Sequence, residues 1–398
     1  FIRSAFCDDN GNVWFGTDGS GLNRLHPASF RHYTTEDGML SNYIWDIYQD
    51  SKGNIWLGTD GDGACMYNGS EFWNFTTEEG VTNDIVMSIT EDRKGNIWMA
   101  TDQGGVSVFD GTAITTYTTE HGLASNRLWK VYEDRKGDMW FGTNDAGVCV
   151  FDGIYYTYYN ESNCLASNTV VEIYEDLQGA MWLVYDNAGV SKIQNGKIQH
   201  FSKKNGLSSN AVKSIEEDSY GNIWFGHASK GVDRFDGSTF TNFTTSDGLT
   251  SNIVWSITED DDYRLWICTD AGISCIDTDT TEHSPFPKIY QFGKENGLKS
   301  LDFYWNASLH DRRDRLWFGG SQALTMLDLK DFTLRESTPE VYLTNVIIDE
   351  ENVDFAKLST SDSLGYSYTD KEQVENVPKG LRLDYYRNHL TFQFAGID

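Results

Sequence analysis

One position that recurs along the sequence holds residues whose side chains suit ligand binding. It lies eleven residues before a tryptophan that opens a repeated motif. In chain order it is occupied by Arg3, Trp45, Met87, Trp129, Val171, Lys213, Trp255 and, after an insertion, Trp305 or Asn306. The flat ring of tryptophan stacks on the apolar face of a sugar, polar groups bond to its hydroxyls, and arginine and lysine suit a carboxylate or sulfate. We therefore predict a ligand site that comprises Arg3, Trp45, Arg127, Trp129, Lys130, Lys213, Trp255 and Trp305.

The same tryptophans have a purely structural alternative. A strand directs successive side chains to opposite faces, so half of each strand lies in the packing between neighbouring units. In this interpretation the tryptophans are core residues that bind nothing. However, a scaffold position does not vary from tryptophan to lysine as this one does, so both interpretations stay open.

Motifs for catalysis or metal binding are absent from the sequence. The eight histidines show no H-E-x-x-H or H-x-x-E-H spacing, and no G-x-S-x-G occurs. The turns resemble calcium loops in composition, with Asp60 and Asp62 as the least implausible ligands, but the EF-hand pattern is not met. The sequence therefore predicts no catalytic residue, no metal and no cofactor, and the chain is predicted not to be an enzyme.

The tryptophan that defines the variable position recurs at a constant interval of 42 residues. The copies are Trp14, Trp56, Trp98, Trp140, Trp182, Trp224 and Trp266, and an eighth, Trp317, follows after 51 residues. An aspartate stands six residues before each copy, and we expect it to accept N–H bonds from the backbone of a hairpin turn. Each repeat contains four short apolar runs separated by turn residues, such as "NIWLGT" and "EFWNFTT", which indicates four strands rather than helices.

These repeats predict an all-β fold, a single β-propeller of four-stranded blades. Apolar residues on both faces of "NIWLGT" require a neighbouring sheet on each side, and four strands in about 42 residues match a propeller blade. The repeat count predicts eight blades. Seven is the alternative, in which the first copy is the tail of a preceding propeller. The inner strands of a propeller begin around one mouth of its channel, so the variable position would gather there.

Composition limits the classes of partner. The chain has 398 residues and a formal net charge of −29, which disfavours nucleic acid and anionic membrane surfaces. No run of about 18 apolar residues occurs, so direct membrane insertion is not predicted. The six cysteines do not suggest a disulfide framework, and Cys65, Cys149 and Cys275 share one repeat position that we expect to be buried. The first residue is Phe1 rather than methionine, and we expect the sequence to be a piece of a longer protein.

The segment "GLTSNIVWSITEDDDYRLWICTDAGISCID" at 248–277 and its copies resemble the two-component regulator propeller repeat. This resemblance covers residues 1 to about 335. The later segments "PEVYLTNVIIDEENVDF" and "LRLDYYRNHLTFQFAGID" are similar to the start of the Y_Y_Y domain, a small β-sandwich. The resemblance implies a propeller at 1–335 and the first strands of a sandwich at 336–398.

The resemblance also implies a function. In that family the two modules form the extracytoplasmic, periplasmic sensor of a membrane-bound regulator, often a hybrid histidine kinase, and the ligands are frequently glycan fragments. We therefore expect non-covalent binding of an oligosaccharide or small polar molecule, and a homodimer in the parent protein. A propeller that binds another protein, and a carbohydrate-active lyase or hydrolase, remain as alternatives.

Overall fold

The structure is a computed structural model of the chain. It describes residues 2–7, 13–17, 21–25, 30–278, 287–332 and 334, and in the C-terminal part residues 340–349, 351–352, 366–367, 370–371, 378–383 and 389–397. Contacts divide the chain into two compact units, residues 1–332 and 333–398.

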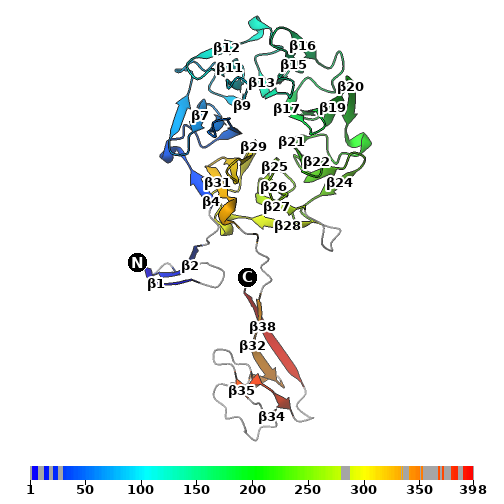
Figure 1. Ribbon diagram of the computed structural model, residues 1–398. Helices are drawn as coiled ribbons and strands as arrows, with labels where there is room; N and C mark the ends of the chain where they lie inside the picture. Colours follow the sequence, from blue (N-terminus) through cyan, green and yellow to red (C-terminus); the bar gives the residue numbers. More distant parts are fainter. Residues whose placement is uncertain are drawn as a thin grey trace. The chain divides into compact units, whose positions relative to one another are not determined.

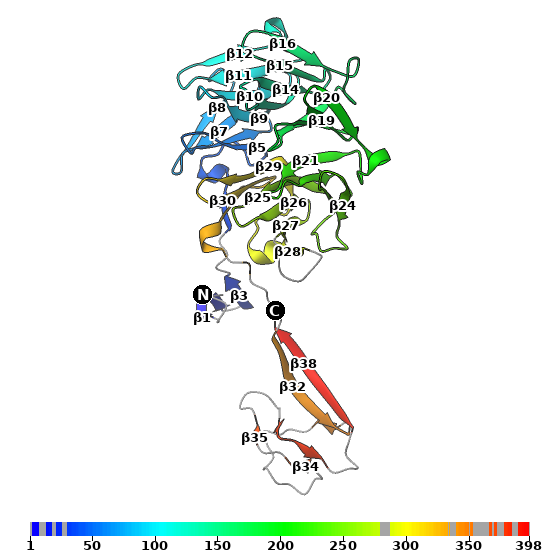
Figure 2. The same cartoon turned by 45° about the vertical axis from the view of Figure 1, so that its right-hand side comes forward.

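The first unit contains a β-propeller of seven four-stranded antiparallel sheets, which Figures 1 and 2 show from two directions. Blades 1 to 6 each use four consecutive strands, and in Figure 1 the first strand of a blade lies nearest the centre of the ring. Blades 1 to 3 comprise β5 (Ile44–Gln49), β6 (Ile55–Thr59), β7 (Ala64–Tyr67) and β8 (Phe72–Phe75); β9 (Val86–Glu91), β10 (Ile97–Thr101), β11 (Gly105–Phe109) and β12 (Ile114–Tyr117); and β13 (Leu128–Glu133), β14 (Met139–Thr143), β15 (Val148–Phe151) and β16 (Tyr156–Tyr159). Blades 4 to 6 comprise β17 (Val170–Glu175), β18 (Met181–Tyr185), β19 (Val190–Gln194) and β20 (Lys197–Phe201); β21 (Val212–Glu217), β22 (Ile223–His227), β23 (Val232–Phe235) and β24 (Phe240–Phe243); and β25 (Val254–Glu259), β26 (Arg264–Thr269), β27 (Gly272–Asp277) and β28 (Lys288–Phe292).

Blade 7 is completed by a strand from the other end of the sequence. Its first three strands are β29 (Phe303–Asp311), β30 (Arg315–Gly320) and β31 (Leu324–Asp328), and its outer strand is β4 (Phe30–Tyr33). Leu324 lies opposite Tyr33 and Leu327 opposite Phe30. Backbone hydrogen bonds between the first and last repeats therefore close the ring, which protects the sheet edges there.

The propeller fold is confirmed, with the seven blades of the alternative rather than the eight of the repeat count. Only the fourth strand of the first repeat joins the ring. Its first three strands, β1 (Ile2–Cys7), β2 (Val13–Thr17) and β3 (Gly21–Leu25), pair with one another in a separate sheet. The sequence motif shows how many copies of the repeat the chain contains. The number of blades depends on which strand pairs with β31.

The repeated aspartate organises each inner hairpin, as predicted. In blade 1, Asp50 Oδ1 accepts the N–H groups of Lys52 and Asn54 at 3.0 and 2.8 Å. Its other carboxylate oxygen accepts the indole N–H of Trp56 at 2.9 Å, a bond that the sequence did not predict. The same aspartate–tryptophan bond occurs in all seven blades. The aspartate thus pairs the polar atom of a tryptophan whose ring is buried, which removes the penalty for burying it.

The repeated tryptophans form the core between blades, also as predicted. Trp56 is 2 % exposed and packs against residues of blade 2 that include Val86 and Met99. Two residues further on, a Cβ on Gly58 would approach the backbone oxygen of Val86 to 2.6 Å, so glycine is needed there for the blades to meet. Cys65, Cys149 and Cys275 are buried free thiols, as the sequence predicted.

The second unit contains two long β-strands and several short ones. β32 (Glu340–Ile348) pairs with β33 (Glu351–Asn352) and with β38 (Leu390–Ile397), and two small sheets join β34 (Tyr366–Ser367) to β37 (Arg382–Leu383) and β35 (Asp370–Lys371) to β36 (Pro378–Lys379). Helical structure in the described residues consists of the 3-10 turns η1 (Thr35–Asp37), η2 (Thr119–His121), η3 (Lys203–Asn205), η4 (Lys294–Asn296) and η5 (Leu329–Asp331). Within the part of the chain that the structure describes, no helix has the length and apolarity needed to cross a membrane.

Candidate ligand site at the propeller axis

The variable position identified in the sequence is a β-bulge in the inner strand of blades 1 to 6. In β5, Ile44 lies opposite Thr59 and Asp46 opposite Gly58, so Trp45 is an extra residue with no partner in β6. The same one-residue shift occurs at Met87, Trp129, Val171, Lys213 and Trp255. A bulge interrupts the alternation of a strand and re-aims its side chain. This position can therefore vary while its neighbours keep the blade packed.

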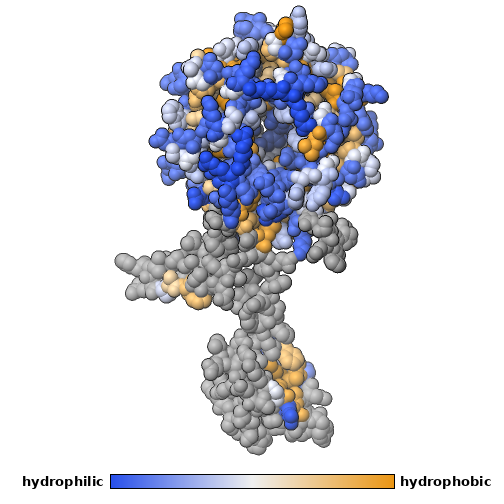
Figure 3. Space-filling model, in the orientation of Figure 1, coloured by the Kyte–Doolittle hydropathy of each residue, from blue (hydrophilic) through white to orange (hydrophobic). Residues whose placement is uncertain are grey.

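Four of these bulged residues meet residues of β29 at the axis of the ring. One cavity is lined by Trp45, Asp46, Met87, Trp129, Lys130, Val171, Glu172, Trp305 and Asn306, which come from five different blades. The ring of Trp129 lies 6.3 Å from that of Trp45, edge to face, and 5.3 Å from that of Trp305, measured between centroids. Figure 3 shows a hollow at the centre of the ring, surrounded mainly by hydrophilic residues. Neighbouring inner strands have thus brought together side chains that lie up to 261 residues apart, from Trp45 to Asn306.

The inner strand of blade 7 partly fills the axis. Between Phe303, opposite Gly320, and Ser308, opposite Phe318, β29 has three more residues than β30, compared with one in the other blades. The indole N–H of Trp305, within this wide bulge, donates to the backbone oxygen of Lys213 in blade 5, and the amide of Asn306 donates to Glu172 in blade 4. The bulge of β29 therefore connects blade 7 to the far side of the ring.

A lysine between two carboxylates carries the charge of this cavity. Lys130 Nζ lies 3.0 Å from Glu172 Oε1, and the side chain of Glu172 is only 7 % exposed. Burial alone would lower the pKa of Lys130, but the charges of Glu172 and Asp46 outweigh it and raise the pKa above the ordinary lysine value. Burial raises the pKa of Asp46, although Lys130 opposes this. One cation beside two carboxylates leaves the cavity with a tendency to hold a proton or a further positive group.

The other two predicted basic residues in this region are also paired. Lys213 Nζ lies 2.6 Å from Asp186 Oδ1 and 3.8 Å from the ring centroid of Trp305. Arg127 is exposed at the start of blade 3, and its Nε lies 3.4 Å from Asp102 Oδ1. Asp102 and Asp186 directly follow the second strands of their blades, at the same edge where the inner strands begin. Lys130, Lys213 and Arg127 therefore each already face a carboxylate.

Four of the eight predicted site residues do not line the cavity. Lys213 and Arg127 are two of them, and the others are Arg3 and Trp255. Arg3 belongs to β1, in the separate three-stranded sheet, so the closed ring has no axial position for it; its side chain lies outside the described residues. Trp255 is half-buried at the bulge of β25 but does not line the cavity. The Nε1 atoms of Trp255 and Trp45 are buried and have no hydrogen-bond partner among the described residues.

The sequence prediction missed the carboxylates of the site. Asp46, Lys130 and Glu172 occupy one repeat position, ten residues before the tryptophan, and the equivalent residues are Ser88, Ser214 and Ser256. The variation among Asp, Ser, Lys and Glu at this repeat position is the sequence signal for these site residues. The prediction included only Lys130 from this position. The metal candidates of the sequence, Asp60 and Asp62, belong to no cluster of potential ligands among the described residues.

The dimensions of the cavity limit what it can hold. About 20 Å³ is open to the centres of water molecules, which is room for one or two waters. A sugar ring does not fit inside without movement of the tryptophans. The geometry therefore suits a ligand that lies across the mouth, in contact with ring edges and with the polar side chains of the rim.

Comparison with known proteins agrees with this architecture. Residues 1–19, 38–61, 80–103, 122–145, 206–229 and 248–271 match the family model described as two component regulator propeller. These six segments therefore match the two-component regulator propeller repeat, as the sequence motif indicated. The Y_Y_Y resemblance of the C-terminal segment stays a prediction. No curated protein matches the sequence at a significant level.

Solved structures share the fold. The extracellular domain of BT3049 from B. thetaiotaomicron, described as a hybrid two component system, has 24% identity and a TM-score of 0.73, over 87% of this chain and 48% of that one. The extracellular domain of BT4673 from the same organism has 22% identity and a TM-score of 0.64, over 89% and 49%. Virginiamycin B lyase from Staphylococcus aureus has 17% identity and a TM-score of 0.60, over 76% and 99%. The chain thus spans about half the length of the two extracellular domains.

Proposed function

We propose that this chain is part of the periplasmic ligand-sensing region of a bacterial two-component regulator, and that it binds a glycan fragment or similar polar molecule non-covalently at the mouth of the propeller axis. The regulator would be a membrane-anchored, dimeric protein such as a hybrid histidine kinase. The observation that carries the proposal is the convergence of Trp45, Trp129 and Trp305 with charged and amide side chains on one small cavity.

The chemistry of the mouth supports a neutral polyhydroxylated ligand. Tryptophan rings offer apolar faces and edges to a pyranose, and carboxylates and amides accept and donate bonds to hydroxyls. Lys130, Lys213 and Arg127 each face a carboxylate, so an acidic sugar would have to displace an existing partner. This argues against the carboxylate or sulfate ligand that the basic residues suggested in the sequence.

A second candidate function is binding to another protein. Ile154, Tyr155 and Tyr158 are 75, 72 and 45 % exposed, and they lie in or just before β16, the outer strand of blade 3. Exposed aromatic side chains on an edge strand are typical of interaction surfaces. This surface is separate from the axial mouth, so the two functions can be distinguished by mutation.

The test is a thermal-shift and calorimetric screen of the chain with a panel of oligosaccharides. A ligand at a hundredfold excess over its Kd stabilises the fold by about 2.7 kcal/mol. We expect Trp129→Ala to weaken the binding of the active sugar at least tenfold, because Trp129 lies between the other two rings.

Trp73→Ala is the matched control, because Trp73 is 56 % exposed on the outer strand of blade 1, away from the axis. Trp129→Phe retains an aromatic ring, so it is a second variant that should fold even if Trp129→Ala does not. Equal binding by wild type and Trp129→Ala would refute the axial site. A screen with no active sugar, together with a protein partner lost on Tyr155→Ala, would favour the second candidate.

A further inference from the structure

Six of the seven junctions between blades are joined by the same hydrogen bond. A backbone N–H of the inner hairpin turn donates to the side chain at the end of the inner strand in the adjacent blade. The acceptors are Glu91, Glu133, Glu175, Glu217, Glu259 and, where blade 7 meets blade 1, Gln49. This bond accounts for a glutamate or glutamine at that position of the repeat.

The junction between blades 6 and 7 has a different construction. The equivalent residue is His310, at the end of β29, and the turn that faces it contains Asp261. The Nδ1 atom of His310 lies 3.9 Å from Asp261 Oδ1, and its Nε2 atom lies 3.1 Å from Asp314 Oδ1. The imidazole thus lies between carboxylates of two adjacent blades.

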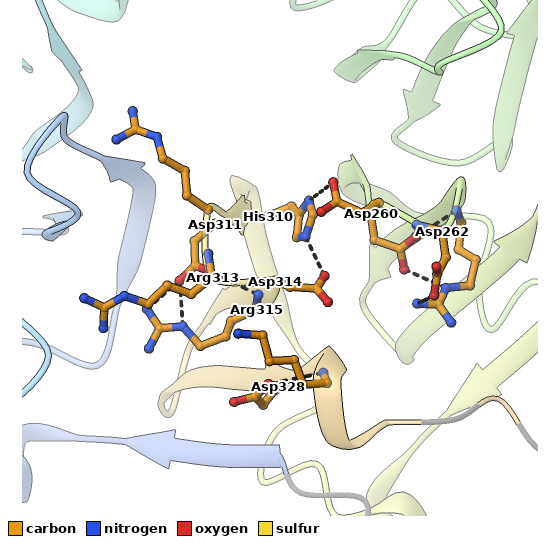
Figure 4. Close-up of polar contacts among 12 residues, drawn as sticks. Asp260, Asp262, His310, Asp311, Arg313, Asp314, Arg315 and Asp328 are labelled. Atoms are coloured by element: carbon orange, nitrogen blue, oxygen red, sulfur yellow. Dashed lines mark hydrogen bonds and ion pairs between the residues drawn. The ribbon is translucent and has the colours of Figure 1, made fainter.

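Asp314 is itself an exception within the repeat. In blades 1 to 5 a glycine with positive φ occupies its position, three residues before the tryptophan. Asp314 adopts the same left-handed conformation, with φ of 62°, which a residue with a side chain rarely takes. In Figure 4 the imidazole of His310 lies between Asp314 and the turn that carries Asp260 and Asp262. The two exceptions, His310 and Asp314, are therefore in contact.

Two arginines of these turns already have carboxylate partners. Arg264 pairs with Asp260 and Asp262, and Arg315 pairs with Asp311. The carboxylates of Asp261 and Asp314 face the histidine instead. Asp261 is 83 % exposed and can move, whereas the side chain of His310 is 15 % exposed and is held in place.

From this geometry we infer that Asp261, His310 and Asp314 form a binding site for a transition-metal dication of the zinc type, which joins blades 6 and 7. One ligand atom from each residue can be chosen so that all three lie within 4.8 Å of one another. Ligands of a tetrahedral zinc ion lie roughly 3.3 Å apart, given bonds of about 2.0 to 2.1 Å. These separations differ by up to roughly 1.5 Å, so a movement of the exposed Asp261 by about that amount, with water as the fourth ligand, would complete the site.

The donor set defines the class of ion. One imidazole and two carboxylates suit zinc and neighbouring first-row metals, whereas calcium and magnesium prefer sites made only of oxygen ligands. The site lies at the ends of the inner strands, and the mouth with the tryptophans lies at their beginnings. The inference is therefore independent of the proposed sugar-binding function.

The experiment measures binding of Zn²⁺ alone to the untagged 398-residue chain by competition with a chromophoric chelator. All variants carry Cys164→Ser, because this partly exposed thiol could bind zinc by itself. We expect one tightly bound Zn²⁺ per chain, a melting temperature that rises with Zn²⁺ and returns with EDTA, and no comparable effect of Ca²⁺ or Mg²⁺. His310→Gln and Asp261→Asn should each weaken binding at least tenfold.

Two controls keep the result interpretable. His121→Gln removes an exposed imidazole from η2 and should leave zinc binding unchanged. Asp261→Asn alters an exposed side chain, so its melting temperature in EDTA should match that of the wild type. If the wild type binds no stoichiometric zinc, or if His310→Gln binds it equally well, His310 serves only as a bridge between the carboxylates and the inference is wrong.

Discussion

At the scale of single residues, the axis of the propeller concentrates ionisable groups that burial perturbs. Besides the group around Lys130, the inner strand of blade 5 carries Glu216, which lies opposite Trp224 in β22. Burial, reinforced by the charge of Glu259, raises the pKa of Glu216 to about 8. Glu216 is therefore protonated at neutral pH in the folded chain, whereas in the unfolded chain it ionises near the ordinary glutamate value of about 4.3.

This difference predicts how stability depends on pH. The folded state holds the proton of Glu216 more tightly than the unfolded state, so the contribution of this group is fully present below about pH 4.3 and is lost as pH rises toward 8. We expect Glu216→Gln to flatten this decline and to stabilise the chain at pH 8 relative to the wild type, by on the order of 1 kcal/mol. Denaturant unfolding at pH 5, 6.5 and 8 measures the free energy of unfolding of both proteins. Glu120→Gln, at an exposed position, is the control, and identical pH profiles for Glu216→Gln and wild type would contradict the prediction.

At the scale of the elements, blade 7 differs from the other six blades in three ways. Its outer strand comes from the start of the chain, the bulge of its inner strand reaches across the axis, and its junction with blade 6 uses a histidine. The closure by β4 is the structural requirement among these, because without it the hydrogen-bonding groups on the outer edge of β31 would have no neighbouring strand.

A pair of truncations tests the role of β4. Removal of residues 1–28 leaves β4 (Phe30–Tyr33) intact and should change the melting temperature by only a few degrees, since β1 to β3 pair with one another and not with a blade. Removal of residues 1–33 also deletes β4, which exposes the apolar surface of Tyr67 and Trp317 that Tyr33 covers. We expect the free energy of unfolding to fall by roughly 5 kcal/mol or more. Thermal unfolding followed by circular dichroism compares the two. Equal melting temperatures would show that blade 7 is stable with three strands.

At the scale of the whole molecule, the dominant property is a net charge of −29 over 398 residues. Lys130, Lys213 and Arg127 do not form a positive patch at the axial mouth, because each has a carboxylate partner. Long-range repulsion and local pairing therefore both act against anionic ligands.

This charge distribution predicts the salt dependence of ligand binding. A neutral oligosaccharide should bind with an affinity that changes less than about twofold between low and moderate salt, because screening acts only on charges. Its uronate or sulfated analogue should bind at least tenfold more weakly at low salt and recover partly when salt is added. Isothermal calorimetry at two ionic strengths measures both. Preferential binding of the acidic sugar that weakens with salt would show that Lys213 or Arg127 exchanges its partner for the ligand.

The sequence alone determined the features that depend on residues within one repeat. The spacing of the tryptophans identified four-stranded blades, and the aspartate six residues earlier identified the hairpin turn. These predictions succeed because the interactions behind them, such as that between Asp50 and Trp56, join residues a few positions apart and recur in every copy.

Only the tertiary structure decided the features that depend on contacts between repeats. The number of blades follows from the pairing of Leu324 with Tyr33, and the charge of the axial cavity follows from the contacts of Glu172 with Lys130 and Asn306. The location of Arg3 was also decided by strand pairing. Its position in the repeat predicted that it lies at the axis, whereas β1 pairs in a separate sheet. The physical reason is that a β-strand can pair with any compatible edge, so the closure of the ring selects one partner among several that the local sequence allows equally well.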